Sequence, residues 1–284
     1  MLKSGNFAVM GLPARPVPDP HEKDLMQQFS SLPASFPLTA AQQDIWLDQL
    51  RMGDSPLYNI GGYVDFEGAV VPELIQRAVE QLVARHDALR TQLHSDDHGL
   101  PRQTFAPALL TEVAQYDLSA LPDPQAASQA LMQAHMARPY QREGAPLFHF
   151  FLVKLADNHY RLGTQAHHVI LDGWGFGQML QSLAQLYTGL EQGRSSEPAA
   201  PSYIDFIDAD QRYRNSSRFV RDRAYWLDKY QVLPEPLLTP KHLANATSNT
   251  LAQPFSVALL DRMEQVASRY QASAFHVLLE AMYV

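Results

Sequence analysis

Two neighbouring strands followed by a long amphipathic helix constrain the fold of this chain more than any other feature. The segments LFHFFLVKL (147–155) and HYRLGTQA (159–166) are rich in strand-forming residues and flank a turn-like Asp-Asn pair, which predicts a hairpin or two neighbouring strands. Residues 174–193 place apolar side chains on one helical stripe: Met179, Leu180, Leu183, Leu186, Tyr187 and Leu190. We therefore expect an α/β fold in which the strand-to-helix junction presents its side chains to a site.

Periodic patterns predict further helices and strands on both sides of that unit. Residues 39–50 begin with a capping-type threonine and place Ile45, Trp46, Gln49 and Leu50 at helical spacing. Residues 61–68 alternate apolar and charged side chains, as a half-buried strand does. Residues 70–90 have the 3.6-residue period after Pro72. Further helical patterns lie at 203–213, 219–230, 255–270 and 273–284.

Proline content divides the chain into three parts. Residues 1–35 are proline-rich and polar, which suits a leader or linker, and order is expected to begin near Phe36. Residues 234–254 form a long connection that is expected to cross between domains. The bounds are therefore expected at 1–35, 36–233 and 234–284. The last helical pattern reaches Val284 without a cap, so we expect the chain to be truncated there.

Charge and composition exclude several classes of function. The net charge is −8 and no dense cluster of lysine and arginine occurs, so a nucleic-acid partner is not expected. The apolar run at 7–12 is too short for a signal peptide, and no segment approaches the roughly 18 apolar residues of a membrane span. A cytoplasmic protein is expected. With no cysteine, the chain has no disulfide, thiolate ligand or thiol nucleophile.

The stretch HHVILDG (167–173) carries the candidate chemistry. A metal site would need another ligand besides these residues, and adjacent histidines on a strand point to opposite sides. A purely structural histidine at a strand end is a second interpretation. The third, which we favour, is acyl transfer, because an imidazole with an ordinary pKa of about 6.5 can accept and return a proton near neutral pH. Asp172 would fix the loop, and Gly173 opens a helix whose N–H groups favour developing negative charge.

Beyond these residues, the chain resembles a known family. HHVILDGWGFG is similar to the HHxxxDG signature of the condensation domains of nonribosomal peptide synthetases, relatives of chloramphenicol acetyltransferase. Three other segments resemble family motifs in the same order: PLTAAQQDIWLDQL (37–50), ARHDALRTQL (84–93), and SYIDF (202–206) with the YWLDKY helix after it. The resemblance covers about residues 36–284 and implies an α/β chloramphenicol acetyltransferase-like lobe with a mixed sheet and flanking helices. The family's later motifs do not occur, so most of the second lobe is expected to be absent, with residues 36–233 as the N-terminal lobe.

The resemblance also implies a role for each matching residue of the signature. His168 is the histidine that the family uses in peptide-bond formation, and Gly173 would supply backbone geometry near the reacting carbonyl. We expect the two tryptophans of these motifs, Trp46 and Trp174, to pack in the core and not to contact substrate.

Three more residues are implied to support the site. His167 would face inward and stabilise the strand. Asp172 would pair with Arg85 of the second motif, which would tie the long helix of residues 70–90 to the histidine loop. From the residues alone, an ordinary solvated arginine on a helix flank is the preferred interpretation of Arg85.

The implied reaction is attack by the amine of an acceptor aminoacyl thioester on a donor acyl or peptidyl thioester. Both substrates would arrive on the phosphopantetheine arms of carrier proteins, with no cofactor or metal bound in the domain itself. An adenylation domain of the same synthetase is an expected partner. The position near Met1 favours a starter domain, whose donor comes in trans or as an acyl-coenzyme A. Alternatives are an epimerization domain, a coenzyme A-dependent acyltransferase and a noncatalytic recruitment module, and the isolated fragment is expected to turn over little.

Overall fold

The computed structural model describes most of the chain. The described residues are 34–107, 109, 111–141, 143–144, 146–194, 200–235 and 254–282. The leader expected at residues 1–35 and the connection expected at 234–254 therefore lie largely outside them. The chain divides into two compact units, Met1–Trp226 and Leu227–Val284. The functional domain bounds expected at 36–233 and 234–284 stay predictions.

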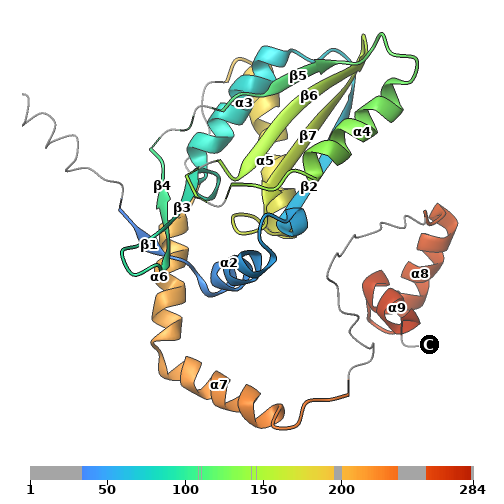
Figure 1. The fold of residues 1–284 in the computed structure, drawn as a ribbon. Helices are drawn as coiled ribbons and strands as arrows, with labels where there is room; N and C mark the ends of the chain where they lie inside the picture. The colour runs from blue at the N-terminus through green and yellow to red at the C-terminus, as the bar shows by residue number, and fades with distance from the viewer. Residues whose placement is uncertain are drawn as a thin grey trace, which may run out of the picture. The chain divides into compact units, whose positions relative to one another are not determined.

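A four-stranded mixed sheet lies at the centre of the first unit (Figure 1). Its order is β2 (Asn59–Glu67), β7 (His159–His167), β6 (Phe148–Ala156) and β5 (Ala114–Asp117). β7 pairs antiparallel with β2 and with β6, whereas β5 runs parallel to β6. The predicted hairpin of β6 and β7 is confirmed. Because β7 is an inner strand, its last residue is held by neighbours on both sides, which gives the following loop a firm base.

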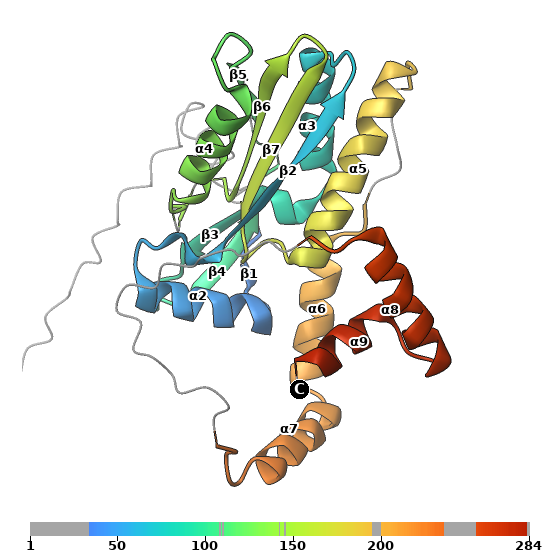
Figure 2. The same ribbon diagram turned by 90° about the vertical axis from the view of Figure 1, so that its right-hand side faces the viewer.

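Helices cover both faces of this sheet (Figure 2). α3 (Pro72–Arg85) and α5 (Gly173–Glu191) pack on one face. α4 (Pro124–Met136), which connects β5 to β6 in the chain, packs on the other face against β2, β7 and β6. The backbone N–H of Val71, which precedes α3, donates to the Tyr187 hydroxyl near the end of α5 at 3.2 Å. The two helices are therefore antiparallel. The mixed sheet with flanking helices confirms the expected fold class, and the predicted helical stripes of α3 and α5 are buried as expected.

A second, smaller sheet has the order β1 (Phe36–Pro37), β4 (Pro101–Phe105) and β3 (Thr91–Ser95). Two 3₁₀ turns, η1 (Pro56–Tyr58) and η2 (Asp87–Arg90), lie before β2 and β3. The remaining helices are α2 (Ala40–Met52), α6 (Tyr203–Arg214), α7 (Ser217–Lys229) and, in the second unit, α8 (Val257–Arg269) and α9 (Ala274–Ala281). Among the described residues, no helix is long and apolar enough to cross a membrane.

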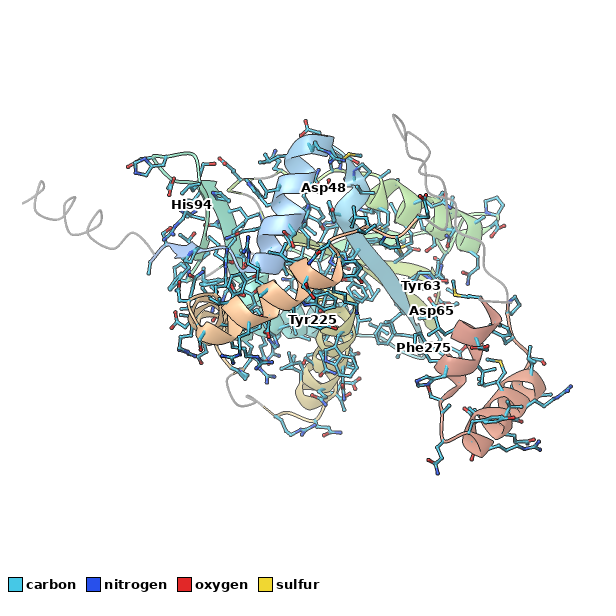
Figure 3. The ribbon with its side chains drawn as sticks, turned by 90° about the horizontal axis from the view of Figure 1, so that it is seen from below. Asp48, Tyr63, Asp65, His94, Tyr225 and Phe275 are labelled. Atoms are coloured by element: carbon cyan, nitrogen blue, oxygen red, sulfur yellow. The ribbon has the colours of Figure 1, made fainter. Side chains whose placement is uncertain are left out.

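Arg161 of β7 fastens α4 to the sheet. Its guanidinium donates two hydrogen bonds to Asp65 of β2, at 2.7 and 2.9 Å, and lies 3.9 Å from the centre of the Tyr63 ring. It also donates to Gln125 and Ser128 of α4. Tyr63 and Asp65 are close neighbours on β2 (Figure 3). The arginine is 5% exposed, and its charge is balanced by a carboxylate and spread over hydrogen-bond acceptors.

The helix predicted from Thr39 is confirmed, but not all of the residues at the predicted helical spacing are buried. Thr39 caps α2 through a capping box with Gln42. The buried residues of α2 are Gln42, Trp46 and Gln49, whereas Leu50 is 46% exposed. The helix thus packs through two amides and one indole, and its apolar spacing does not mark its inner face.

Candidate active site

The two histidines lie where β7 ends beneath the start of α5. We call residues 167–172 the histidine loop. The backbone N–H of His167 donates to the Leu147 carbonyl and that of His168 to the Tyr58 carbonyl, both at 2.8 Å. Tyr58 closes η1 and precedes β2, and Leu147 precedes β6. The loop is therefore anchored on both sides by the strands that flank β7.

His167 points into the interior. Its side chain is buried, and its Nδ1 accepts the Val169 backbone N–H at 3.1 Å, which requires that the proton of the neutral ring sits on Nε2. Nε2 faces the Gln49 side-chain oxygen at 3.4 Å. Burial, together with the charge of neighbouring His168, lowers the pKa of His167 to about 4. Both ring nitrogens are thus occupied within the chain, and the ring is neutral at pH 7.

His168 is placed differently from its neighbour. It is the first residue of the turn after β7 and is partly exposed. Among the described residues, no group forms a hydrogen bond with its ring. Its imidazole is therefore free to interact with a molecule outside the chain, which is the property that a proton-transferring residue needs.

Asp172 and Gly173 form the start of α5. The Asp172 carboxylate accepts the Gly175 N–H at 2.7 Å and so caps the helix. Gly173 is the first helical residue, and a Cβ atom built on it would have no other heavy atom within 4 Å. Open space therefore lies beside the helix N-terminus, next to the histidine loop.

Arg85 is the last residue of α3 and is partly buried. It follows Val71 by fourteen residues, and Gly173 precedes Tyr187 by fourteen residues. Since α3 and α5 are antiparallel and Val71 contacts Tyr187, this spacing puts Arg85 at the same end of the helix pair as Asp172. The ion pair between them stays a prediction.

Asp87 connects the motif at residues 84–93 to the motif at residues 202–206, a contact that was not predicted from the sequence. Its carboxylate accepts the Ser202 hydroxyl at 2.7 Å and the Tyr203 N–H at 3.0 Å, and it pairs with the Arg90 guanidinium. Burial raises the pKa of Tyr203, and the charges of Asp210 and Asp172 raise it further. The matching motifs marked these segments, but no spacing rule predicted their contact.

The tryptophans behave in opposite ways. Trp46 of α2 is 5% exposed and packs in the core, as expected. The expectation for Trp174 is wrong, because this side chain is 79% exposed. It occupies the second position of α5, where it lies off the stripe that meets the sheet; that stripe begins at the partly buried Phe176 and continues at Met179 and Leu180.

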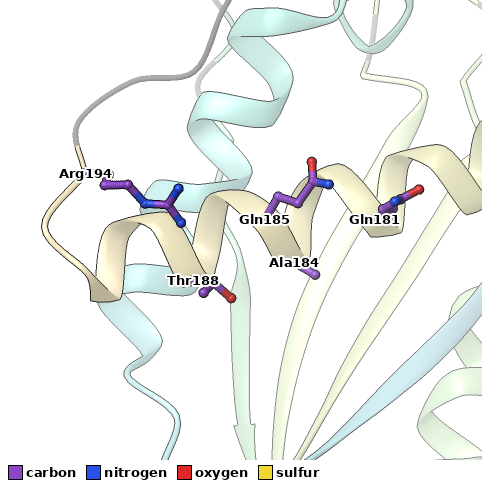
Figure 4. Close-up of a pocket in the computed structure, with 5 residues that line it drawn as sticks. All are labelled: Gln181, Ala184, Gln185, Thr188 and Arg194. Atoms are coloured by element: carbon purple, nitrogen blue, oxygen red, sulfur yellow. The ribbon is translucent and has the colours of Figure 1, made fainter.

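One cavity of the described part of the chain adjoins the histidine loop. A small enclosed cavity touches His167 and Gln49, and the remaining residues that line it are Trp46, Leu93, Tyr140, Gln141 and Leu147. An open depression runs along the outer face of α5, lined by Gln181, Ala184, Gln185, Thr188 and Arg194 (Figure 4). The histidine loop does not line this depression. Within the described residues, no three histidine, cysteine or acidic side chains are grouped to hold a metal ion.

Comparison with known proteins identifies the arrangement. A family model described as a condensation domain matches residues 34–284. The chain is 36% identical over 225 residues to isonitrile lipopeptide synthase of Streptomyces coeruleorubidus, covering 78% of this chain and 15% of that protein. It is 32% identical over 220 residues to enterobactin synthase component F of Escherichia coli K12, covering 75% and 17%. The chain thus spans less than a fifth of the length of these relatives.

Solved structures agree with the sequence relatives. A variant of the starter condensation domain of rhizomide synthetase, in complex with C8-CoA, is similar with a TM-score of 0.68 at 32% identity, over 76% of this chain and 49% of that one. The first condensation domain of the calcium-dependent antibiotic synthetase, in complex with a substrate analogue, has a TM-score of 0.66 at 28% identity, over 72% and 49%. The similarity therefore covers about half of each solved domain.

Proposed function

The chain belongs to the condensation-domain family of nonribosomal peptide synthetases, and from this premise we propose that it joins a donor acyl thioester to the amine of an acceptor aminoacyl thioester. One observation carries the proposal. His168 is partly exposed and makes no ring hydrogen bond to a described residue, beside an N-terminal helix turn bordered by open space. An imidazole and oriented N–H groups are the parts that acyl transfer to an amine requires.

The reaction balances with His168 as proton carrier. The acceptor amine nitrogen attacks the donor carbonyl carbon, and the oxygen gains negative charge in the tetrahedral intermediate. The amine then loses a proton to the His168 imidazole, the C–N bond is kept, and the C–S bond breaks. The imidazole returns the proton to the leaving sulfur, which departs as a free thiol. An amine pKa near 7.7 to 8 makes only a modest demand on the base, so orienting the amine is the larger task of the residue.

We propose a starter role, in which the donor is an acyl-coenzyme A. This is supported by the similar starter condensation domain, solved with C8-CoA and also with C8-CoA and Leu-SNAC, and by the similarity to a lipopeptide synthase. The acceptor would be delivered on the phosphopantetheine arm of a carrier protein loaded by an adenylation domain. No cofactor of the domain's own is part of the proposal, and the cytoplasmic location also stays a prediction.

The experiment is to incubate the full-length gene product with octanoyl-CoA and the small acceptor mimic Leu-SNAC, and to follow products by mass spectrometry. We expect octanoyl-leucyl-SNAC. Product that forms only when octanoyl-carrier protein replaces octanoyl-CoA would overturn acyl-coenzyme A as the donor but keep the condensation activity. Racemised leucine without amide would identify an epimerization domain, and carrier binding without any turnover would identify a recruitment module.

Replacing Gly173 by alanine tests whether the open space at the start of α5 holds the reacting carbonyl. The new methyl group meets nothing within 4 Å, so the free energy of unfolding should stay within about 0.5 kcal/mol of wild type or rise slightly. The rate of amide formation should fall on the order of tenfold or more, because the methyl group occupies the space of the substrate. Unchanged turnover would remove Gly173 from the site. Urea unfolding and steady-state kinetics measure the two quantities.

The Asp172–Arg85 pair is also proposed and has its own test. Asp172→Asn keeps the helix cap but removes the charge, and Arg85→Met removes the other charge. We expect the loss of unfolding free energy in the double variant to differ from the sum of the two single losses by only about 1 kcal/mol, because Asp172 is exposed. Asp172→Ala should cost about 1 kcal/mol more than Asp172→Asn, since it also removes the cap. Strict additivity of Asp172→Asn and Arg85→Met would mean that the two side chains do not pair.

A further inference from the structure

The buried glutamines of α2 are an unusual feature of the first unit. Gln42 and Gln49 are each 4% exposed and lie seven residues apart, on the same face of the helix as Trp46. A side-chain amide buried without hydrogen bonds is costly, so such a residue persists where its polar atoms have partners. The partners of both glutamines include the histidine loop.

Gln42 holds the loop from one side. Its Nε2 donates to the Val169 carbonyl at 3.2 Å, directly after His168. Its Oε1 accepts the Thr39 N–H at 3.0 Å and the Gln103 Nε2–H at 2.9 Å. Gln103 of β4 is fully buried and also donates to the Pro37 carbonyl. Hydrogen bonds to the helix cap and to the small sheet therefore fix the Gln42 amide. The fixed amide in turn holds the Val169 carbonyl in place.

Gln49 acts on the other histidine. Its Nε2 donates to the Gly53 carbonyl at 2.6 Å and to the Ser55 carbonyl at 3.1 Å, which leaves its Oε1 directed at the His167 ring. His167 in turn accepts the Val169 N–H. Val169 is thus held at its carbonyl by Gln42 and at its N–H by a histidine that Gln49 orients.

An indirect connection runs from the same helix to the backbone of His168 through Tyr58. Asp48, on α2 (Figure 3), accepts the Tyr58 hydroxyl at 2.8 Å. The Tyr58 carbonyl accepts the His168 N–H. The backbone of the loop is therefore connected to α2 directly before and directly after the His168 side chain.

We propose that Gln42 and Gln49 are positioning residues, which set the direction of the His168 imidazole by holding Val169 from both sides. The inference rests on the proposed function, because it gives the two amides a part in the same condensation. Both glutamines are buried and hydrogen-bond with the loop, so they act through the loop and not on the substrate.

The experiment measures kcat, KM and thermal midpoint of the full-length gene product with octanoyl-CoA and Leu-SNAC. The variants are Gln42→Met and Gln49→Met, which keep the volume and remove the amide. Gln43→Met is the matched control, since Gln43 contacts Leu38 and Arg214 and not the histidine loop. We expect kcat to fall about tenfold to a hundredfold for both loop-holding variants, with KM within about twofold of wild type. The control should keep wild-type kcat. Wild-type kcat in Gln42→Met and Gln49→Met would overturn the proposal.

A second measurement separates positioning from general loss of structure. In a His168→Ala background there is no imidazole to orient, so adding Gln42→Met should lower the residual rate no further. Equal fold-losses in both backgrounds would show that Gln42 serves only stability and would contradict the proposal. If Gln42→Met is unfolded at the assay temperature, Gln42→Asn, which withdraws the amide by one methylene, replaces it with the same expectations.

The same data test separately the proposed function of His168 and the positioning role of the two glutamines. If His168→Ala alone keeps the wild-type rate, the proposed function of His168 fails. If His168→Ala is impaired and the glutamine variants are not, the positioning role fails and the function stands.

Discussion

His168→Ala lowers the kcat of amide formation by about a hundredfold to ten-thousandfold, the range for loss of a proton-transferring side chain. The substitution should leave the free energy of unfolding within about 0.5 kcal/mol of wild type, because the ring forms no hydrogen bond to any described residue. Steady-state kinetics with octanoyl-CoA and Leu-SNAC, together with urea unfolding, measure both. The two results in combination distinguish a catalytic histidine from a structural one.

His94→Ala is the matched control for this substitution. His94 lies on β3 of the small sheet (Figure 3), and its ring hydrogen-bonds with the Ser35 hydroxyl and not with the histidine loop. Its kcat should equal that of wild type. A His168→Ala protein with wild-type turnover would remove the imidazole from the mechanism, and a variant with strongly reduced stability would indicate the structural interpretation of His168.

The free energy of unfolding falls by several kcal/mol between pH 6.5 and pH 4. Burial lowers the pKa of His167 and of His135 to about 4, with His149 and Arg138 also lowering that of His135. In the unfolded chain both have a pKa near 6.5. Between these values the unfolded state binds more protons, so stability decreases as pH falls, by about 3 kcal/mol for His167 once pH 4 is reached and by less for His135, whose charge is more screened by solvent. Urea unfolding from pH 7 to pH 4 measures the decrease.

His135→Phe isolates one of the two histidines. The His135 ring stacks on Phe151 at 4.1 Å and on His149 at 4.8 Å between ring centres, on the α4 side of the sheet. A phenyl ring keeps the stacking and cannot be protonated, so stability at pH 7 should change by about 1 kcal/mol or less. The decrease between pH 6.5 and pH 4 should shrink by about 1 to 2 kcal/mol, while carboxylate titration affects both proteins equally. Parallel pH curves for the variant and wild type would mean that His135 does not titrate in this way.

Much of the fold could be predicted from periodicity. The predicted helices α3 and α5 are confirmed. They could be predicted because each buries a continuous apolar stripe against the sheet, and such a stripe gives a clear 3.6-residue pattern in the sequence. The hairpin of β6 and β7 is also confirmed. It could be predicted because its strands are rich in aromatic and branched residues. α4 was not singled out. Its inner face includes Ser128 and His135 as well as Met132, so its apolar stripe is interrupted.

The candidate site was predictable in sequence position but not in its contacts. The spacing of HHVILDG located the histidines at the strand end, and the family resemblance chose between them. The burial of the Gln42 and Gln49 side chains could not be predicted, because the position of apolar residues along a helix predicts that polar residues such as glutamine face solvent. The contact of Asp87 with Ser202 joins residues 115 positions apart, and no local pattern encodes such a pairing.

The central claim is amide formation at His168, and one measurement tests it most directly. It quantifies octanoyl-leucyl-SNAC and free coenzyme A thiol together over time, in wild type and in His168→Ala. We expect one amide formed per thiol released in wild type, and loss of both in the variant. Thiol release without amide would identify a hydrolase, and equal amide formation by the two proteins would contradict the assignment of His168.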